Sequence, residues 1–201
     1  MTERAAHVPA LAEAFREHGF AGASVAALCA ATGLGKGSLY NFFPGGKEDM
    51  AAAVLADVDA WFTASVFEPL EAARAGDPEA VNAMFDAVTA YFRSGRRVCL
   101  QGAFALGRER DRFAGTIAGY FERWIAALAA ALRAAGHSQP TARLAAVETV
   151  AAIQGAIVLS RALDNPDIFQ QVIECARARL CPPRAARPGA GISPASPRHG
   201  A

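Results

Sequence analysis

The residues between positions 35 and 41 are small or polar, and they offer the hydrogen-bonding groups with which proteins contact DNA. They are Gly35, Lys36, Gly37, Ser38, Tyr40 and Asn41. Leu34 and Leu39 would anchor a helix here on its inner side, and the small side chains leave it slender enough to enter a major groove. The chemistry that this segment predicts is contact with base edges and phosphates.

Two short helices around a tight turn are needed to position these residues. Val25 and Leu28 share one face of the first helix, and Ser24 is a suitable N-cap for it. Gly33 supplies the turn into the second helix. With the amphipathic helix expected over residues 4–18, this pattern predicts a small helix-turn-helix domain.

The charge balance alone does not predict a DNA-binding protein. The formal net charge is +1, and residues 1–50 carry four basic against five acidic side chains. The only two lysines in the sequence, Lys36 and Lys47, lie at the two ends of the expected recognition helix. Nucleic-acid binding must therefore depend on where the charges sit.

The remainder of the chain also has a helical pattern. Of the 201 residues 53% are hydrophobic, which is enough for a sizeable core. Apolar residues recur at helical spacing up to residue 180, with no strand pattern, and Pro69 is expected to break or kink the helix that starts at Lys47. We predict a helix-turn-helix domain over residues 1–46, a ligand-binding and dimerisation domain over 47–180, and a disordered Pro-rich tail over 181–201.

Several other classes of protein are disfavoured. Polar residues interrupt every apolar run before the roughly 20 residues that a membrane helix needs, so we expect a cytoplasmic protein without membrane contact. The four cysteines are scattered, which predicts buried thiols, with Cys181 as the exception to consider first, rather than disulfides or a metal site. Dispersed histidines and missing hydrolase and phosphate-loop motifs lead us to expect no enzyme and no cofactor.

Aromatic residues at helical spacing within residues 47–180 predict either an ordinary core or a ligand pocket, and both interpretations stay open. The candidate ligand-binding residues are Trp61, Phe62, Phe85, Phe92, Phe104, Phe113, Tyr120 and Trp124, with Gln101 and Gln154 as polar groups that could orient a ligand. The set favours a small hydrophobic or aromatic effector over a highly charged metabolite.

Residues 11–50 resemble the DNA-binding domain of TetR/AcrR-family transcriptional repressors. The Phe-Pro-Gly-Gly-Lys run at 43–47, followed by the segment that starts at Cys99, resembles the LmrA/YxaF-like branch. The resemblance implies an all-α fold of about nine helices, with an N-terminal three-helix domain and a C-terminal ligand-binding and dimerisation domain. It also implies a homodimer that releases double-stranded operator DNA when a small ligand binds. The last two helices, within residues 140–180, are the expected dimer surface.

The resemblance assigns roles to individual residues. Lys36, Gly37 and Ser38 would face base edges, whereas Tyr40 and Asn41 would contact phosphate or the adjacent base. Lys47 would bind phosphate at a helix start, where free backbone N–H groups also favour an anion. Ser24, Thr32 and Gly35 complete the DNA-binding set as N-cap, turn former and cap of the recognition helix. Ala23 and Gly35 replace a Thr and a Ser that are frequent in the family, which suggests modest affinity.

A second function remains open. The near-neutral charge of residues 1–50 would also suit a helical small-molecule-binding or scaffold protein whose helix-turn-helix no longer reads DNA.

Overall fold

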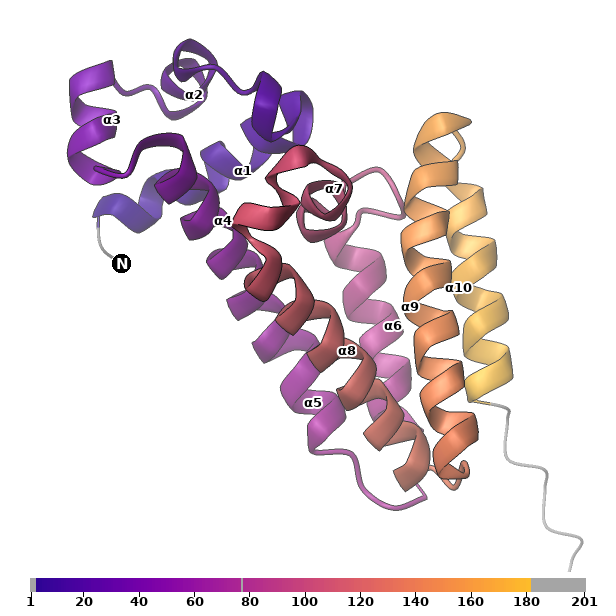
Figure 1. The fold of residues 1–201 in the computed structure, drawn as a ribbon. Helices are drawn as coiled ribbons and strands as arrows, with labels where there is room; N and C mark the ends of the chain where they lie inside the picture. The colour runs from indigo at the N-terminus through magenta and orange to yellow at the C-terminus, as the bar shows by residue number, and fades with distance from the viewer. Residues whose placement is uncertain (1–2, 77, 182–201) are drawn as a thin grey trace, which may run out of the picture.

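The computed structural model describes residues 3–76 and 78–181, and this part of the chain is built from helices with no strand. Figure 1 shows a small N-terminal domain beside one end of a longer helical bundle. The predicted all-α fold is confirmed. The tail predicted over 181–201 lies outside the described residues, apart from Cys181.

Three helices form the N-terminal domain: α1 (Glu3–Gly22), α2 (Val25–Thr32) and α3 (Lys36–Phe42). Leu11 and Phe15 lie on the buried face of α1, as the spacing predicts. The regular part of α1 ends at Gly19, with φ 65°, and α2 ends at Gly33, with φ 71°. Both angles are in the left-handed region, which glycine adopts without the steric cost of a Cβ atom.

A single helical run connects the two domains. It consists of α4 (Gly46–Phe62), a π-helical segment (Thr63–Phe67) and α5 (Glu68–Glu71). Pro69 does not break this run, because it lies in the first turn of α5 after the π-helical segment. Proline lacks an N–H and crowds the preceding turn, and a π-helical turn is one way in which a helix accommodates such a defect.

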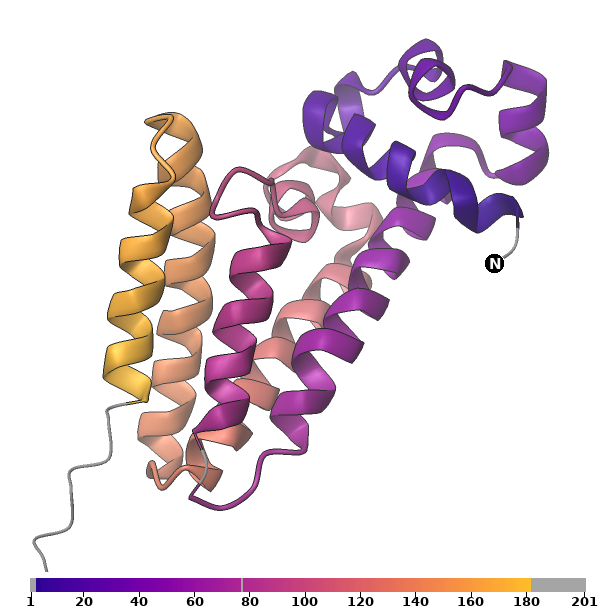
Figure 2. The ribbon, with the colours of Figure 1, turned by 180° about the vertical axis from the view of Figure 1, so that it is seen from behind.

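The remaining helices complete the bundle. They are α6 (Glu79–Tyr91), α7 (Leu100–Leu106), a 3-10 helix (Arg108–Arg112), α8 (Ala114–Ala134), α9 (Gln139–Ala162) and α10 (Asp167–Leu180). With α4 to α5 counted as one run, the described residues contain nine α-helical elements. The helices α9 and α10 form the predicted helical hairpin, and α6 packs between them and the α4–α5 run (Figure 2).

The prediction that no helix is long and apolar enough for a membrane was wrong. Two runs, Gly46–Glu71 and Gln139–Ala162, satisfy that test by length and composition. The sequence analysis missed them because it treated isolated polar residues as interruptions. Core helices of soluble proteins pass the same test, and here the first run packs on α1, α6 and α8 while the second packs on α8 and α10.

The prediction of buried thiols holds only for Cys99. Cys175 is exposed, and Cys29 and Cys181 are half-buried, so Cys181 is not the single exception. Cys175 lies on the outer side of α10, because the inner face of that helix is formed by Phe169, Ile173 and Ala176.

The turn before α3 gives a first prediction. Replacement Gly33→Ala should lower the free energy of unfolding by about 1–2 kcal/mol, because a Cβ atom is strained at φ 71° although no atom lies within 4 Å of it. Gly119→Ala, on exposed α8 backbone with equal free space, should instead stabilise the protein by about 0.5–1 kcal/mol. Urea unfolding at one protein concentration measures both, and equal effects of the two changes would contradict the assignment.

Candidate DNA-binding surface and ligand-binding sites

The helix α3 presents its polar residues outward. Lys36, Gly37, Ser38, Tyr40 and Asn41 are all exposed, and Tyr40 retains 37% of its accessible surface. Leu39 is fully buried and fixes the opposite side of α3 to the domain. The structure therefore brings five of the nine candidate DNA-binding residues together on one short exposed helix.

Ser24, Thr32 and Gly35 lie in the turns that set the position of α3. The Ser24 hydroxyl accepts a hydrogen bond from the Ala27 backbone N–H at 3.1 Å, so it caps α2. The Thr32 hydroxyl donates to the Leu28 carbonyl at 2.8 Å. Gly35 is the N-cap of α3 without a side-chain hydrogen bond. The two hydroxyl groups thus hold the helix-turn-helix in shape.

Lys47 differs from the other candidates, because its ammonium group is engaged within the protein. Its Nζ donates to the Ala21 carbonyl at 3.4 Å and lies 4.8 Å from the centre of the Phe20 ring. The start of α4 is also acidic, because Glu48 and Asp49 lie in its first turn. An Asp49 carboxylate oxygen accepts a hydrogen bond from the Gly45 N–H at 3.4 Å. In this arrangement Lys47 fastens α4 to the end of α1.

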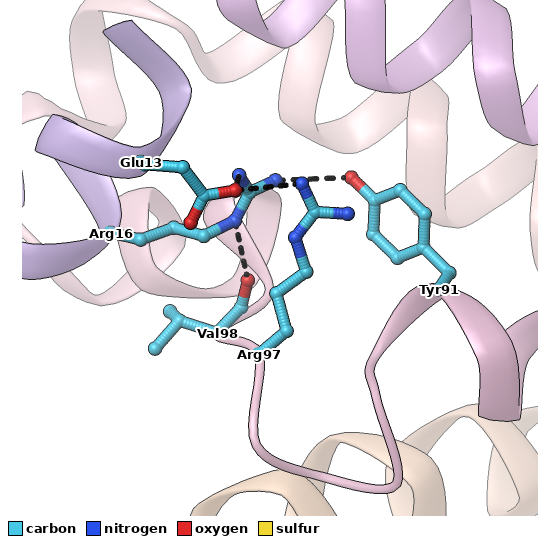
Figure 3. A network of polar contacts seen from close by, with 5 residues as sticks. All are labelled: Glu13, Arg16, Tyr91, Arg97 and Val98. Atoms are coloured by element: carbon cyan, nitrogen blue, oxygen red, sulfur yellow. Dashed lines mark hydrogen bonds and ion pairs between the residues drawn. The ribbon is translucent and has the colours of Figure 1, made fainter. Parts of the chain in front are cut away.

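Arg16 of α1 reaches into the bundle and forms the centre of a polar network (Figure 3). It donates to the Tyr91 hydroxyl at 3.2 Å and to the Val98 carbonyl at 3.3 Å, and it pairs with Glu13 at 2.9 Å. Only 6% of the Arg16 side chain is exposed. Arg97 donates to the same Glu13 oxygen at 2.9 Å. The network joins the N-terminal domain to the end of α6 and the loop between α6 and α7.

The ionisation of these groups reflects their burial and their neighbours. Burial raises the pKa of Tyr91 in spite of two adjacent arginines. Burial lowers the pKa of Arg16, and the positive charge of Arg97 adds to that effect. At Glu13, burial acts upward, but the hydrogen bond from Arg97 and the surrounding positive charges outweigh it and lower the pKa. The Glu13 carboxylate offsets the repulsion between the Arg16 and Arg97 guanidinium groups.

Phe104 and Phe113 of the candidate ligand set lie at the domain junction. Phe104 packs against Phe15 and Phe20 of α1 with ring centres 6.0 and 5.8 Å apart, and Phe113 lies 5.9 Å from Phe20. These four rings connect the N-terminal domain to α7 and to the start of α8.

Phe62 is the centre of a second aromatic cluster inside the bundle. Its ring lies within 6.0 Å of Trp61, Phe92, Tyr120 and Trp124, all members of the candidate set. The same cluster includes Phe67 and Tyr91, which the sequence analysis missed. Tyr91 lies three residues after Val88 and seven after Met84, so the periodicity could have identified it. Phe67 lies five residues after Phe62 in the π-helical segment, a spacing that α-helical periodicity does not predict. Phe85 is buried elsewhere, under the Arg177 guanidinium at 5.4 Å.

Three buried polar atoms of α7 and α8 are left without hydrogen bonds. They are the Tyr120 hydroxyl, Trp124 Nε1 and Gln101 Oε1. Gln101 is fully buried, and its Nε2 donates to the Leu55 carbonyl of α4 at 3.4 Å. Buried polar groups normally find partners, so unpaired groups of this kind mark places where a ligand or water could bind.

Gln154 lies apart from the other candidates, in an apolar cavity of about 610 Å³ between α7, α8 and α9. Cys99, Phe121 and Ile157 also line this cavity. The Nε2 of Gln154 is buried and makes no hydrogen bond, although it lies beside the Cys99 thiol, a weak acceptor. The ten candidate residues therefore divide among the domain junction, the Phe62 cluster, the Phe85 position and this cavity.

Comparison with known proteins decides the family. Residues 9–54 match the family profile described as bacterial regulatory proteins of the tetR family. Residues 78–175 match the profile of the LmrA/YxaF-like transcriptional regulator C-terminal domain. The chain belongs to the TetR family of transcriptional regulators. Ligand-responsive repression is typical of this family, and the resemblance to the LmrA/YxaF-like branch is confirmed.

Solved structures of TetR regulators share the fold. A TetR transcriptional regulator from Legionella pneumophila is 20% identical with a TM-score of 0.73, and the match covers 88% of this chain and 95% of that one. The regulatory protein TetR from Rhodobacter sphaeroides is 20% identical with a TM-score of 0.70, covering 84% and 95%. The fatty acid degradation regulator FadR from Bacillus halodurans is 15% identical with a TM-score of 0.69, covering 92% and 99%. A comparison with curated proteins found no significant match.

The Arg16 network of this TetR-family regulator gives a second prediction. Tyr91→Phe should lower the free energy of unfolding by about 1–3 kcal/mol, because the buried Arg16 guanidinium loses an acceptor while the ring contacts remain. Tyr40→Phe, which removes an exposed hydroxyl from α3, should leave stability unchanged within about 0.5 kcal/mol. Thermal and urea unfolding measure both variants. A Tyr91→Phe protein as stable as the wild type would show that this hydrogen bond does not hold the junction.

Proposed function

We propose that this TetR-family regulator is a cytoplasmic repressor that binds operator DNA as a homodimer and releases it when a small hydrophobic or aromatic effector binds. The observation that carries the proposal is the outward polar face of α3, held by the fully buried Leu39. A helix of this shape and polarity suits the major groove. A scaffold protein that no longer reads DNA would have no need for such an exposed face.

The outer side of α9 supports the dimer. It exposes a row of large apolar side chains: Leu144, Val147, Val158, Leu159 and Leu163, each at least 40% exposed. Their spacing follows one face of the helix, and a monomer rarely leaves such a row in water. We propose that α9 and α10, within residues 140–180, form the subunit contact and place two α3 helices on successive half-sites about 34–36 Å apart.

The effector is proposed to have a substantial apolar part. The cavity of about 610 Å³ beside Gln154 and the aromatic cluster around Phe62 both lie in the C-terminal domain. Gln154 in the cavity, Tyr120 in the cluster and Gln101 against α4 offer polar groups that could orient it. Both places border helices that contact the DNA-binding domain, which gives a ligand a physical route to α3.

A third prediction tests DNA recognition. Lys36→Ala should weaken binding to a DNA site selected by the protein from a random pool by about 1–3 kcal/mol, because α3 loses its exposed ammonium group. Arg74→Ala is the charge-matched control, since α5 and the turn after it lie at the opposite end of the bundle from α3 (Figure 1). Fluorescence polarisation over a range of salt concentrations measures both. Equal affinities of the two variants would argue against α3 as the reading helix.

A fourth prediction tests the subunit contact. Leu159→Glu should convert the dimer to monomer at micromolar concentration and strongly weaken operator binding, because a charge is placed in the apolar row of α9. Ala56→Glu, on the exposed side of α4, should leave the dimer intact. Size-exclusion chromatography with light scattering gives the mass of each variant. A dimeric Leu159→Glu protein would rule out this face as the interface.

A further inference from the structure

The loop between α6 and α7 gathers positive charge against α1. Five arginines and two glutamates line a hollow of about 390 Å³ there. The arginines are Arg16, Arg93, Arg96, Arg97 and Arg161, and the glutamates are Glu13 and Glu17. The whole chain has a formal net charge of only +1, so this hollow is a local concentration of positive charge. Such a place attracts anions.

The charges of the hollow are only partly compensated. Glu13 accepts from both Arg16 and Arg97 at 2.9 Å. Arg161 donates one hydrogen bond to the Arg96 backbone carbonyl at 2.8 Å, which uses a donor but neutralises no charge. The Nε of Arg97 is buried and makes no hydrogen bond. An anion in the hollow would find guanidinium donors available.

The backbone of the loop holds these arginines in a fixed arrangement. Arg93 and Ser94 have φ values of 51° and 53°, which cost a residue with a side chain about 1–2 kcal/mol each. The Ser94 hydroxyl accepts a hydrogen bond from Gln170 Nε2 at 2.7 Å, so α10 fixes the loop. The arginines are thus presented by a strained but anchored turn.

The apolar cavity beside Gln154 adjoins the arginine hollow. Val98 and Arg161 line both spaces, so the two spaces are neighbours that share these side chains as a wall. The wall of the cavity is apolar at Phe121 and Ile157, while Gln154 Nε2 offers an unused donor within it. An apolar surface next to a cluster of guanidinium groups is complementary to a molecule with an apolar body and an anionic head.

We propose that the cavity and the arginine hollow form one binding site for an anionic amphiphile, a molecule with an alkyl or aromatic body and a carboxylate or phosphate head. The body lies between α7, α8 and α9, and the head lies in the hollow among Arg93, Arg96, Arg97 and Arg161, beside the Glu13–Arg16 pair. This inference rests on the proposed function in taking the amphiphile as the effector.

The position of the head gives a mechanism of release. A carboxylate or phosphate in the hollow competes with the Glu13 carboxylate for Arg97 and Arg16. The Glu13 and Arg16 contacts tie α1 to the bundle, so their exchange loosens α1, and α2 and α3 with it (Figure 3). The ligand would act through a change of ion-pair partners rather than through contact with α3.

Titration calorimetry on the full-length dimer tests the site with decanoate, decyl phosphate and 1-decanol, each below its aggregation concentration. We expect at least one of the two anions to bind about tenfold or more tightly than the alcohol, a difference of about 1.4 kcal/mol. Comparison of the two anions distinguishes a carboxylate site from a phosphate site. Arg93→Gln and Arg161→Gln should remove most of this preference, and Arg93→Gln, at a residue that does not line the cavity, should leave decanol binding unchanged. Arg133→Gln, at the exposed end of α8, is the matched control and should behave as wild type.

The apolar half of the site has its own variant. Ala105 lines the cavity, so Ala105→Phe should fill it and weaken both the anions and decanol. Equal binding of the anions and decanol, or a preference unchanged in the two arginine variants, would overturn the inference.

DNA binding is measured separately by fluorescence polarisation with and without the preferred anion. A protein that binds its selected DNA but neither anion retains the proposed DNA-binding function and refutes this site. A protein that binds the anion with the expected preference but binds no DNA supports the site and refutes the proposed function. Anion binding that leaves DNA affinity unchanged refutes the assignment of the amphiphile as effector.

Discussion

The buried charge of Arg16 is the constraint on which the junction between the two domains depends. A guanidinium group with 6% exposure of its side chain is costly to bury unless acceptors surround it. Those acceptors come from α1 itself through Glu13 and from the bundle through Tyr91 and Val98. In the observed orientation of the N-terminal domain, the Arg16 charge is surrounded by acceptors. A shift of α1 would separate Arg16 from Tyr91 and Val98, and the guanidinium group would then need new acceptors.

Other contacts at the junction support the same orientation of α1. The Phe15, Phe20, Phe104 and Phe113 rings exclude water around the junction, which strengthens the polar contacts beside them. Glu48 at the start of α4 also forms an ion pair with Arg112, the residue before Phe113. Tyr91 belongs both to the Arg16 network and to the aromatic cluster around Phe62. A change in the packing around Phe62 would therefore affect α1 through Tyr91, which contacts both Phe62 and Arg16.

The fold could be predicted from local sequence patterns, whereas contacts between residues far apart in the sequence could not. The turn at Gly33, the burial of Leu39 and the exposed residues of α3 follow from helical periodicity and turn chemistry within a few residues. Lys47 bonds to Ala21, 26 residues earlier, and no spacing rule predicts that contact. Periodicity likewise identified Phe62 and Phe104 as inward-facing but could not show that one lies in the bundle core and the other at the domain junction.

The structure explains the near-neutral charge of residues 1–50. In that segment Glu13 neutralises Arg16, Asp49 pairs with Arg4, and Glu48 pairs with Arg112 of the bundle, so three of the five acidic groups are used in ion pairs with arginines. Lys47 is also engaged internally, which leaves Lys36 as the lysine that α3 presents outward. Electrostatic attraction from one subunit is then weak, and in the dimer that we propose the affinity for DNA would come from two α3 helices held at a fixed separation. In that dimer a small displacement of α1 would be sufficient to release DNA, because it would change the separation on which the proposed binding depends.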